Sequence, residues 1–194
     1  MFPLAEIPTQ IEWQGCVKEL ALEEGAEWLA ARLLKGHLAP AGNAGYDIHQ
    51  SALFPGLTFQ IKVSRPGEGH KVQKIVNGRD SYWDESPTWT WGEYNKGEAD
   101  IYILYGVNGE MVYPFVVPHS IWERQAFSNG NKGLVLRVST EQYSRCGRHE
   151  RATKRNKFWQ YYIKSWPGGL FRRVTYYTKR QPCDQIPLVE IAVV

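Results

Sequence analysis

Three polar side chains between Gly45 and Pro66 have the types and the spacing for chemistry on a phosphate group. Asp47 lies in one short segment, and Gln60 and Lys62 lie in the next, beyond a turn signal at Pro55-Gly56. If they converge at a sheet edge, they offer a carboxylate, an amide oxygen and an ammonium group. Such a set suits a hard divalent cation beside a phosphate, although the same spacing also fits the polar face of an ordinary half-buried hairpin.

Two strands joined by a turn must position these side chains. The second strand alternates in polarity, with apolar residues at positions 57, 59, 61 and 63 and polar residues at positions 58, 60, 62 and 64. In the first strand, Asp47 and His49 are expected to share a face. Tyr46 and Ile48 are expected on the opposite face. If the apolar faces of both strands lie on one side, the three polar side chains share the other.

This segment resembles the core of the PD-(D/E)XK nuclease superfamily, which includes restriction enzymes, junction resolvases and repair nucleases. That core carries an acidic residue on one strand, and then an acidic or amide residue, any residue and a lysine on the next. Asp47 and the run Gln60-Ile61-Lys62 match this pattern, with Tyr46 in place of the usual proline and Gln60 in place of the usual acid. The resemblance implies a restriction-endonuclease-like α/β fold, in which a mixed β-sheet is flanked by helices.

The resemblance also implies roles for these residues. Mg2+ or Mn2+ would be bound by Asp47, by the side-chain oxygen of Gln60 and by the backbone carbonyl of Ile61. Lys62 would orient or help deprotonate the attacking water and offset charge in the transition state. Superfamily members often place a glutamate on the helix before the hairpin, and Glu27 is the match here, for a second metal or an outer-shell water. The implied products are a 5′-phosphate and a 3′-hydroxyl.

Helical periodicity from about Ile11 to Lys35 predicts the helix that carries Glu27, and Gly36 is the expected stop. From Gly67 to Gly97 the chain is rich in aromatic residues and is expected to be irregular. A loop of this length in a compact domain is usually functional. It is expected to contact DNA or a partner subunit, with Lys74 and Arg79 as its DNA contacts.

Further along the chain, two apolar runs flank Asn108-Gly109, which is a strong signal for a tight hairpin turn. Ser120 is the expected cap of a short helix from Ile121 to Phe127. Residues Leu134 to Val138 predict another strand. This order of elements favours a mixed sheet with flanking helices, in the α/β class.

The last third of the chain is basic, since the stretch from Tyr143 to Gln181 contains a single acid, Glu150. Aromatic residues are interleaved with the basic ones. This pattern is typical of a nucleic-acid binder, although a solvated basic helix and hairpin is the alternative. The chain is therefore predicted to be one nuclease domain, residues 1–194, with a catalytic core at 1–140 and a DNA-contacting region at 141–194. The predicted DNA contacts in that region are Arg148, Lys154, Arg155, Lys157, Arg172 and Arg173.

Composition sets the class and the expected location. The chain has 194 residues, of which 43% are hydrophobic and 22% charged, so a globular domain with a sizeable core is expected. Three cysteines lie far apart, which favours a reducing compartment and no disulfide framework. The sequence has no membrane-spanning apolar run and no signal pattern at its start, so a cytoplasmic location without a membrane partner is expected.

The sequence therefore predicts a metal-dependent endonuclease acting on double-stranded DNA, most simply a sequence-specific enzyme of restriction type. A homodimer is expected because cutting both strands commonly needs two active sites. A homing endonuclease and a junction resolvase on the same fold are the alternatives within this class. A non-catalytic DNA-binding module is the alternative outside it, and Gln60 is the residue that keeps it open.

Overall fold

The computed structural model describes most of the chain between Glu23 and Lys179. The predicted DNA contact Arg148, and the part of the predicted first helix before Glu23, lie outside the described residues. The described residues are 23–40, 45–67, 71–76, 79–84, 87–93, 99–109, 111–128, 134–141, 143–145, 153–155, 157–164 and 168–179.

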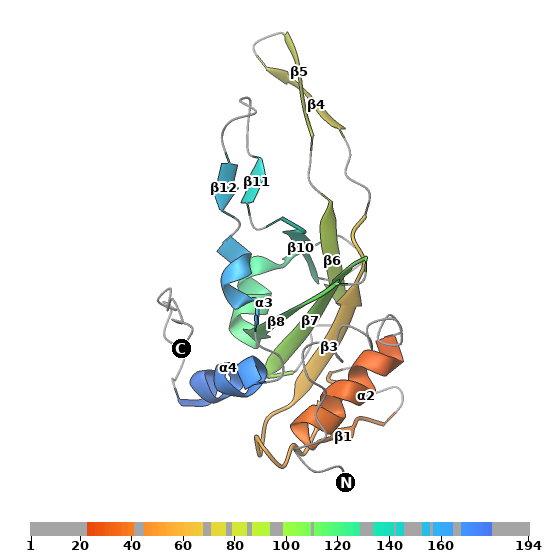
Figure 1. Ribbon diagram of the computed structural model, residues 1–194, viewed down its shortest axis with the longest axis vertical. Coiled ribbons are helices and arrows are strands. Elements are labelled where there is room, and N and C mark those ends of the chain that lie inside the picture. The colour runs from red at the N-terminus through yellow and green to blue at the C-terminus, as the bar shows by residue number, and fades with distance from the viewer. Residues whose placement is uncertain are drawn as a thin grey trace.

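A five-stranded mixed sheet forms the centre of the molecule (Figure 1). Its strands are β1 (His37–Leu38), β2 (Ile48–His49), β3 (Phe59–Ser64), β7 (Ile101–Asn108) and β8 (Met111–Pro118). In space the order is β1-β2-β3-β7-β8, so β3 is the central strand and β1 lies at an edge. Strands β3 and β7 are parallel, and the other neighbouring pairs are antiparallel.

Two helices cover one face of this sheet and form the helix layer. They are α2 (Glu23–Leu34) and α4 (Gly168–Lys179). Ala26, Ala30 and Leu33 of α2 recur at helical spacing and are buried with Phe59 and Ile61 of β3. In Figure 1 helix α2 lies alongside β3, and α4 lies near the same end of the sheet.

Helix α2 ends at Leu34, and the backbone reverses one residue before the predicted stop at Gly36. Lys35 takes a positive φ of 48°, and the Gly36 N–H donates to the carbonyl of Ala31 at 2.9 Å. The hydroxyl of Ser51 donates to the Leu34 carbonyl at 2.6 Å, which fastens the loop after β2 to the end of the helix.

The opposite face of the sheet is covered by an aromatic layer. Its elements are helix α3 (His119–Gln125), the 3-10 helix η3 (Lys157–Tyr161) and a small sheet of β6 (Thr88–Glu93), β10 (Leu134–Ser139) and β9 (Phe127–Ser128). The layer buries a cluster that includes Trp89, Trp91, Phe115, Trp122 and Phe158.

Trp89 fixes the small sheet against the main one. Its indole N–H donates to the Val107 carbonyl, and that of Trp91 donates to the Tyr105 carbonyl, both at 3.2 Å. A Cβ atom added at Gly106 would come within 2.5 Å of the Trp89 ring. The residue between these two carbonyls must therefore be glycine for the indole to lie on the backbone of β7.

Two hairpins extend from the same end of the molecule in Figure 1. They are β4 (Lys71–Val76) with β5 (Arg79–Asp84), and β11 (Tyr143–Arg145) with β12 (Thr153–Arg155). The expectation that 67–97 is irregular was therefore wrong, since this segment holds the first hairpin and β6. The missed signals are the Asn77-Gly78 dipeptide between β4 and β5, and the alternation of threonine with tryptophan in β6.

The α/β class with a mixed sheet and flanking helices is confirmed. The predicted hairpin is β7 and β8, and Gly109 in its turn has a φ of 61°. Helix α3 begins two residues earlier than predicted, and Ser120 is not its cap, since Pro118 holds that position without a side-chain hydrogen bond. In the part of the chain that the structure describes, no helix is long and apolar enough to cross a membrane.

Candidate functional site

Asp47 lies where β2 meets the central strand. Its N–H donates to the Phe59 carbonyl at 2.9 Å, and its carbonyl accepts from Ala39 at 2.8 Å. Its side chain continues the pairing, because Oδ2 accepts the backbone N–H of Ile61 at 2.6 Å. The carboxylate thus accepts a backbone hydrogen bond of β3 that the two-residue strand β2 does not accept. This bond fixes the position of the carboxylate beside β3.

Gln60 is the second member of the site, and only 7% of it is exposed. Its Nε2 donates to the same Oδ2 of Asp47 at 2.5 Å. An ionised carboxylate only accepts hydrogen bonds, so the amide must present its nitrogen to Asp47. The amide oxygen of Gln60 therefore belongs to the other side of the amide group, whereas the sequence led us to expect it beside the carboxylate.

Lys62 follows two residues after Gln60 and is half-buried. Phe59 and Ile61 are buried in the helix layer, so Gln60 and Lys62 face the aromatic layer, as the alternation predicted. Tyr46 does not lie on the face that the sequence predicted. It packs with the aromatic layer, and its ring centroid lies 5.8 Å from that of His49. A residue before a two-residue strand is not bound by strand alternation.

The site does not lie at the edge of the sheet. It lies on the central strand, in a row of side-chain positions that we call the Asp47 row: Ala39, Asp47, Gln60, Tyr102 and Val117. Tyr102 closes one side of it, since its ring stacks on Trp122 with centroids 4.7 Å apart and planes within 5°. Towards the other side, only the short strands β2 and β1 follow.

Glu27 is half-buried on α2 and adjoins Ala30 and Ala31 on the helix surface. Its helix covers the face that Phe59 and Ile61 form, opposite the face of Gln60. Among the described residues there is no group of three or more His, Cys, Asp and Glu side chains placed to hold a metal ion. The role of Glu27 at a metal therefore stays a prediction.

The predicted DNA contacts that the structure describes fall on four separate elements: the β4–β5 hairpin, β12, η3 and α4. Lys74 and Arg79 lie on the β4–β5 hairpin, and Lys154 and Arg155 lie on β12. Lys157 is exposed at the start of η3, within the aromatic layer.

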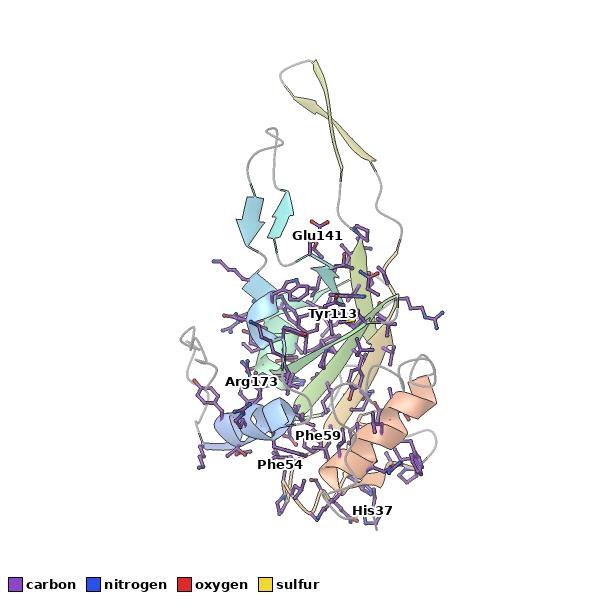
Figure 2. All side chains as sticks on the ribbon, viewed as in Figure 1. His37, Phe54, Phe59, Tyr113, Glu141 and Arg173 are labelled. Atoms are coloured by element: carbon purple, nitrogen blue, oxygen red, sulfur yellow. The ribbon has the colours of Figure 1, made fainter. Side chains whose placement is uncertain are left out.

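Helix α4 carries the remaining two predicted contacts, Arg172 and Arg173. Arg173 is half-buried, and its Nη2 donates to the Gln160 carbonyl at 3.1 Å, so it fastens α4 to η3 (Figure 2). The Tyr177 hydroxyl donates to the Val116 carbonyl at 2.8 Å, and its burial raises the pKa of that hydroxyl above the ordinary value. These contacts hold α4 against η3 and β8.

A second group of polar residues lies beside the site, and of these sequence reasoning singled out only His49. His37 belongs to β1, a strand that the sequence did not predict, and it pairs in register with His49. Thr58 and Asp100 join the first ends of β3 and β7, because Asp100 Oδ2 accepts both the N–H and the hydroxyl of Thr58, at 2.8 and 2.9 Å. Strands of two residues have no periodicity to find, so the sequence carried no signal that would pair the two histidines.

Comparison with protein-family models and with curated proteins found no match. Among solved structures, the chain is similar to a bacterial homing endonuclease, I-Ssp6803I, with a TM-score of 0.43 and 15% identity. The alignment covers 84% of this chain and 98% of that one. At this level the likeness assigns neither a fold family nor an activity to the chain.

Proposed function

We propose that this protein is a metal-dependent endonuclease of the PD-(D/E)XK type that hydrolyses phosphodiester bonds in duplex DNA. The observation that carries the proposal is the joining of Asp47 to the Gln60-Ile61 unit by two hydrogen bonds to one carboxylate oxygen. Lys62 follows on the same face of β3. This arrangement supports the proposal, because the superfamily pattern leads us to expect these same positions side by side.

The residues fit Mg2+ or Mn2+ by the chemistry of their donors. A carboxylate, an amide oxygen and a backbone carbonyl are hard oxygen ligands, and Mg2+ commonly takes few protein ligands and keeps several waters. Asp47, Gln60 and Ile61 would hold the ion, which would supply charge stabilisation at the phosphate and a more acidic water. The observed amide of Gln60 turns its nitrogen to Asp47. Binding through its oxygen therefore requires rotation of the amide group.

The protein groups then divide the remaining work. Asp47 keeps its place because the Ile61 N–H holds it, whatever the state of Gln60. Lys62 carries a positive charge on the same face, where it orients the attacking water or helps to deprotonate it, and offsets charge on the phosphorane-like transition state. Glu27 lies on α2, which covers the opposite face of β3, so we assign it no part in this step.

We propose duplex DNA as the substrate and a homodimer as the active form. Restriction-type and homing-type enzymes differ in the length and stringency of the site they cut, and a resolvase prefers a four-way junction. Cleavage of a random-sequence duplex library beside a junction substrate separates the three. A short fixed site supports the restriction type, a long degenerate site supports the homing type, and cleavage of the junction alone supports the resolvase.

The DNA surface is tested by reversing charges in two pairs. Lys154→Glu with Arg155→Glu alters β12, on the side of the aromatic layer, and Arg172→Glu with Arg173→Glu alters α4, on the helix layer. We expect the first pair to weaken binding to all sequences and lower the salt dependence, by about one counterion for each phosphate that the protein no longer neutralises. The second pair should have a smaller effect, measured by fluorescence anisotropy over a range of salt. Because Arg173 also fastens α4 to η3, circular dichroism must first show that the second pair is folded. Equal effects in folded variants would show that DNA contacts both layers.

A non-catalytic DNA-binding module is the second candidate, and the same hydrogen bonds favour it. Both groups that donate to Asp47 Oδ2 belong to the protein, so the carboxylate is satisfied there without a cation. In this case the protein would bind DNA with metal or without it and would not cut.

Plasmid and library cleavage in Mg2+ and in Mn2+ decides between the two candidates. Asp47→Asn is the sharper variant than Asp47→Ala, because asparagine keeps an acceptor for the buried Ile61 N–H and so preserves the sheet. We expect Asp47→Asn and Lys62→Ala to abolish cleavage and keep DNA binding. Glu141→Gln, an exposed carboxylate well away from His37 in Figure 2, is the matched control and should cut normally. Normal cutting by either site variant contradicts the proposal, and binding without cutting by the wild type supports the module.

A further inference from the structure

Two histidines lie side by side in the row of side chains next to the Asp47 row, on the two short strands β1 and β2. His37 of β1 and His49 of β2 are register partners, and their ring centroids are 6.3 Å apart. His37 is exposed and His49 is half-buried. Figure 2 shows His37 at the margin of the molecule, away from the aromatic core around Tyr113. Both rings are therefore within reach of a large ligand.

The two histidines face the same way as the candidate site. Ile48 is buried in the helix layer, so its neighbour His49 points to the opposite face, where Gln60 lies. The ring of His49 lies 5.8 Å from that of Tyr46, which packs with the aromatic layer on this face. His37 points to the same face, because it pairs in register with His49 on the neighbouring strand. A ligand lying across Asp47 on this face therefore passes both imidazoles.

The spacing suits a chain of phosphates. His49 is two residues from Asp47 along β2, a distance of about 6.6 Å in an extended strand. Continued across the sheet, the His49 row contains Thr58, and then Asp100, whose Oδ2 is already bonded to the N–H and hydroxyl of Thr58. In the His49 row, the two imidazoles thus lie on β1 and β2. The Asp100 carboxylate precedes β7, two strands away from His49.

We infer that His37 and His49 form a binding subsite for a backbone phosphate next to the scissile one. The inference rests on the proposed endonuclease function and extends it to a second phosphate of the same DNA strand. Imidazole N–H groups donate to phosphate oxygens, as do many side chains that position DNA without reading its sequence. Their role is to fix the register of the strand over Asp47.

The test removes the charge of one phosphate at a time. A duplex carrying the mapped cleavage site is made with a single neutral methylphosphonate at each position around the scissile bond. Wild type, the double variant His37→Ala with His49→Ala, and the control Leu38→Ala are compared by single-turnover cleavage. Leu38 is exposed on the same strand but pairs with Ile48, so it lies on the other face. A second double variant, His37→Gln with His49→Gln, keeps hydrogen-bond donors and guards against misfolding of the first.

We expect one neutral linkage beside the scissile bond to slow the wild type and Leu38→Ala about tenfold, the size of a hydrogen bond to a charged group. The alanine double variant should be about tenfold slower on unmodified DNA and insensitive to that linkage, and the glutamine double variant should recover part of the rate. The subsite is refuted if each neutral linkage slows the alanine double variant as much as it slows the wild type, or if this variant cuts unmodified DNA at the wild-type rate. Either result leaves the proposed endonuclease activity intact. If the wild type binds but does not cut, the endonuclease is refuted. In that case, dissociation constants measured over the same methylphosphonate series test the phosphate subsite without cleavage.

Discussion

Replacing Gln60 with glutamate restores the residue that most superfamily members carry, yet the structure predicts that Gln60→Glu destabilises the metal-free protein. In the wild type the amide Nε2 donates to Asp47 Oδ2 at 2.5 Å, in a position that is 7% exposed. A carboxylate there has no hydrogen to donate. Two negative groups would then lie at hydrogen-bond distance with little water between them.

The size of the penalty is limited by protonation. The introduced carboxyl has an ordinary pKa of about 4.3, and each pH unit above it costs about 1.4 kcal/mol when the proton is kept. Holding it protonated at pH 7, so that it donates to Asp47, therefore costs about 4 kcal/mol. Lys62 on the same face reduces this figure if its ammonium turns to the new charge. We expect a loss of about 2–4 kcal/mol at pH 7 that shrinks as the pH falls towards 5.

Metal should reverse the effect, because a divalent cation between two carboxylates removes their repulsion and stabilises the folded state by mass action. Urea unfolding in EDTA and in Mg2+, at pH 5 and pH 7, measures both parts. The double variant Asp47→Asn with Gln60→Glu removes the repulsion between two carboxylates. It should recover only part of the metal-free stability, because one asparagine atom cannot both accept from the Ile61 N–H and donate to the new carboxylate. Gln60→Glu as stable as the wild type in EDTA at pH 7 would refute the hydrogen-bond orientation from which the reasoning starts.

Three further predictions concern the layers that hold the site. Gly106→Ala should destabilise the protein by about 2–3 kcal/mol, because its Cβ would lie 2.5 Å from the Trp89 ring, and thermal unfolding measures this; an unchanged midpoint would mean that the indole moves freely. Lys35→Gly should stabilise it by about 1 kcal/mol in urea, since Lys35 has a φ of 48° that glycine adopts without strain, and a loss of stability would contradict this. Burial raises the pKa of Tyr177, so its contribution is complete below about pH 10 and is lost as the pH rises further. Tyr177→Phe should therefore show a shallower loss of stability between pH 9 and pH 11.

The parts of the fold that were predictable are those with repeated signals. Strand β3 alternates over its whole length, and the pair β7 and β8 is joined at a dipeptide typical of tight turns. The β4–β5 hairpin carries the same kind of signal, Asn77-Gly78, and was missed because the many aromatic residues around it suggested a loop. In β6, tryptophan alternates with threonine because one side of that strand is buried on β7.

The geometry of the site was predictable in part. The meeting of Asp47 with Gln60 follows from pairing two strands, which alternation indicates. The direction of the Gln60 amide does not, since it depends on an acceptor 13 residues earlier in the chain. The histidine pair was out of reach for a similar reason, because β1 and β2 have two residues each and are defined by their partners rather than by their own sequence.

The placement of the tryptophans gives the protein a built-in optical probe. Of those whose side chains the structure describes, Trp89, Trp91 and Trp122 are buried in the aromatic layer, and Trp28 on α2 is 54% exposed. Blue-shifted emission from these three buried residues reports on the aromatic layer, whereas the two longest helices of the described residues, α2 and α4, contribute to circular dichroism at helical wavelengths. Recording both signals during unfolding follows the two layers separately. A ligand that binds to one face of the sheet should change the signal of the layer on that face, either tryptophan emission or circular dichroism, before the other.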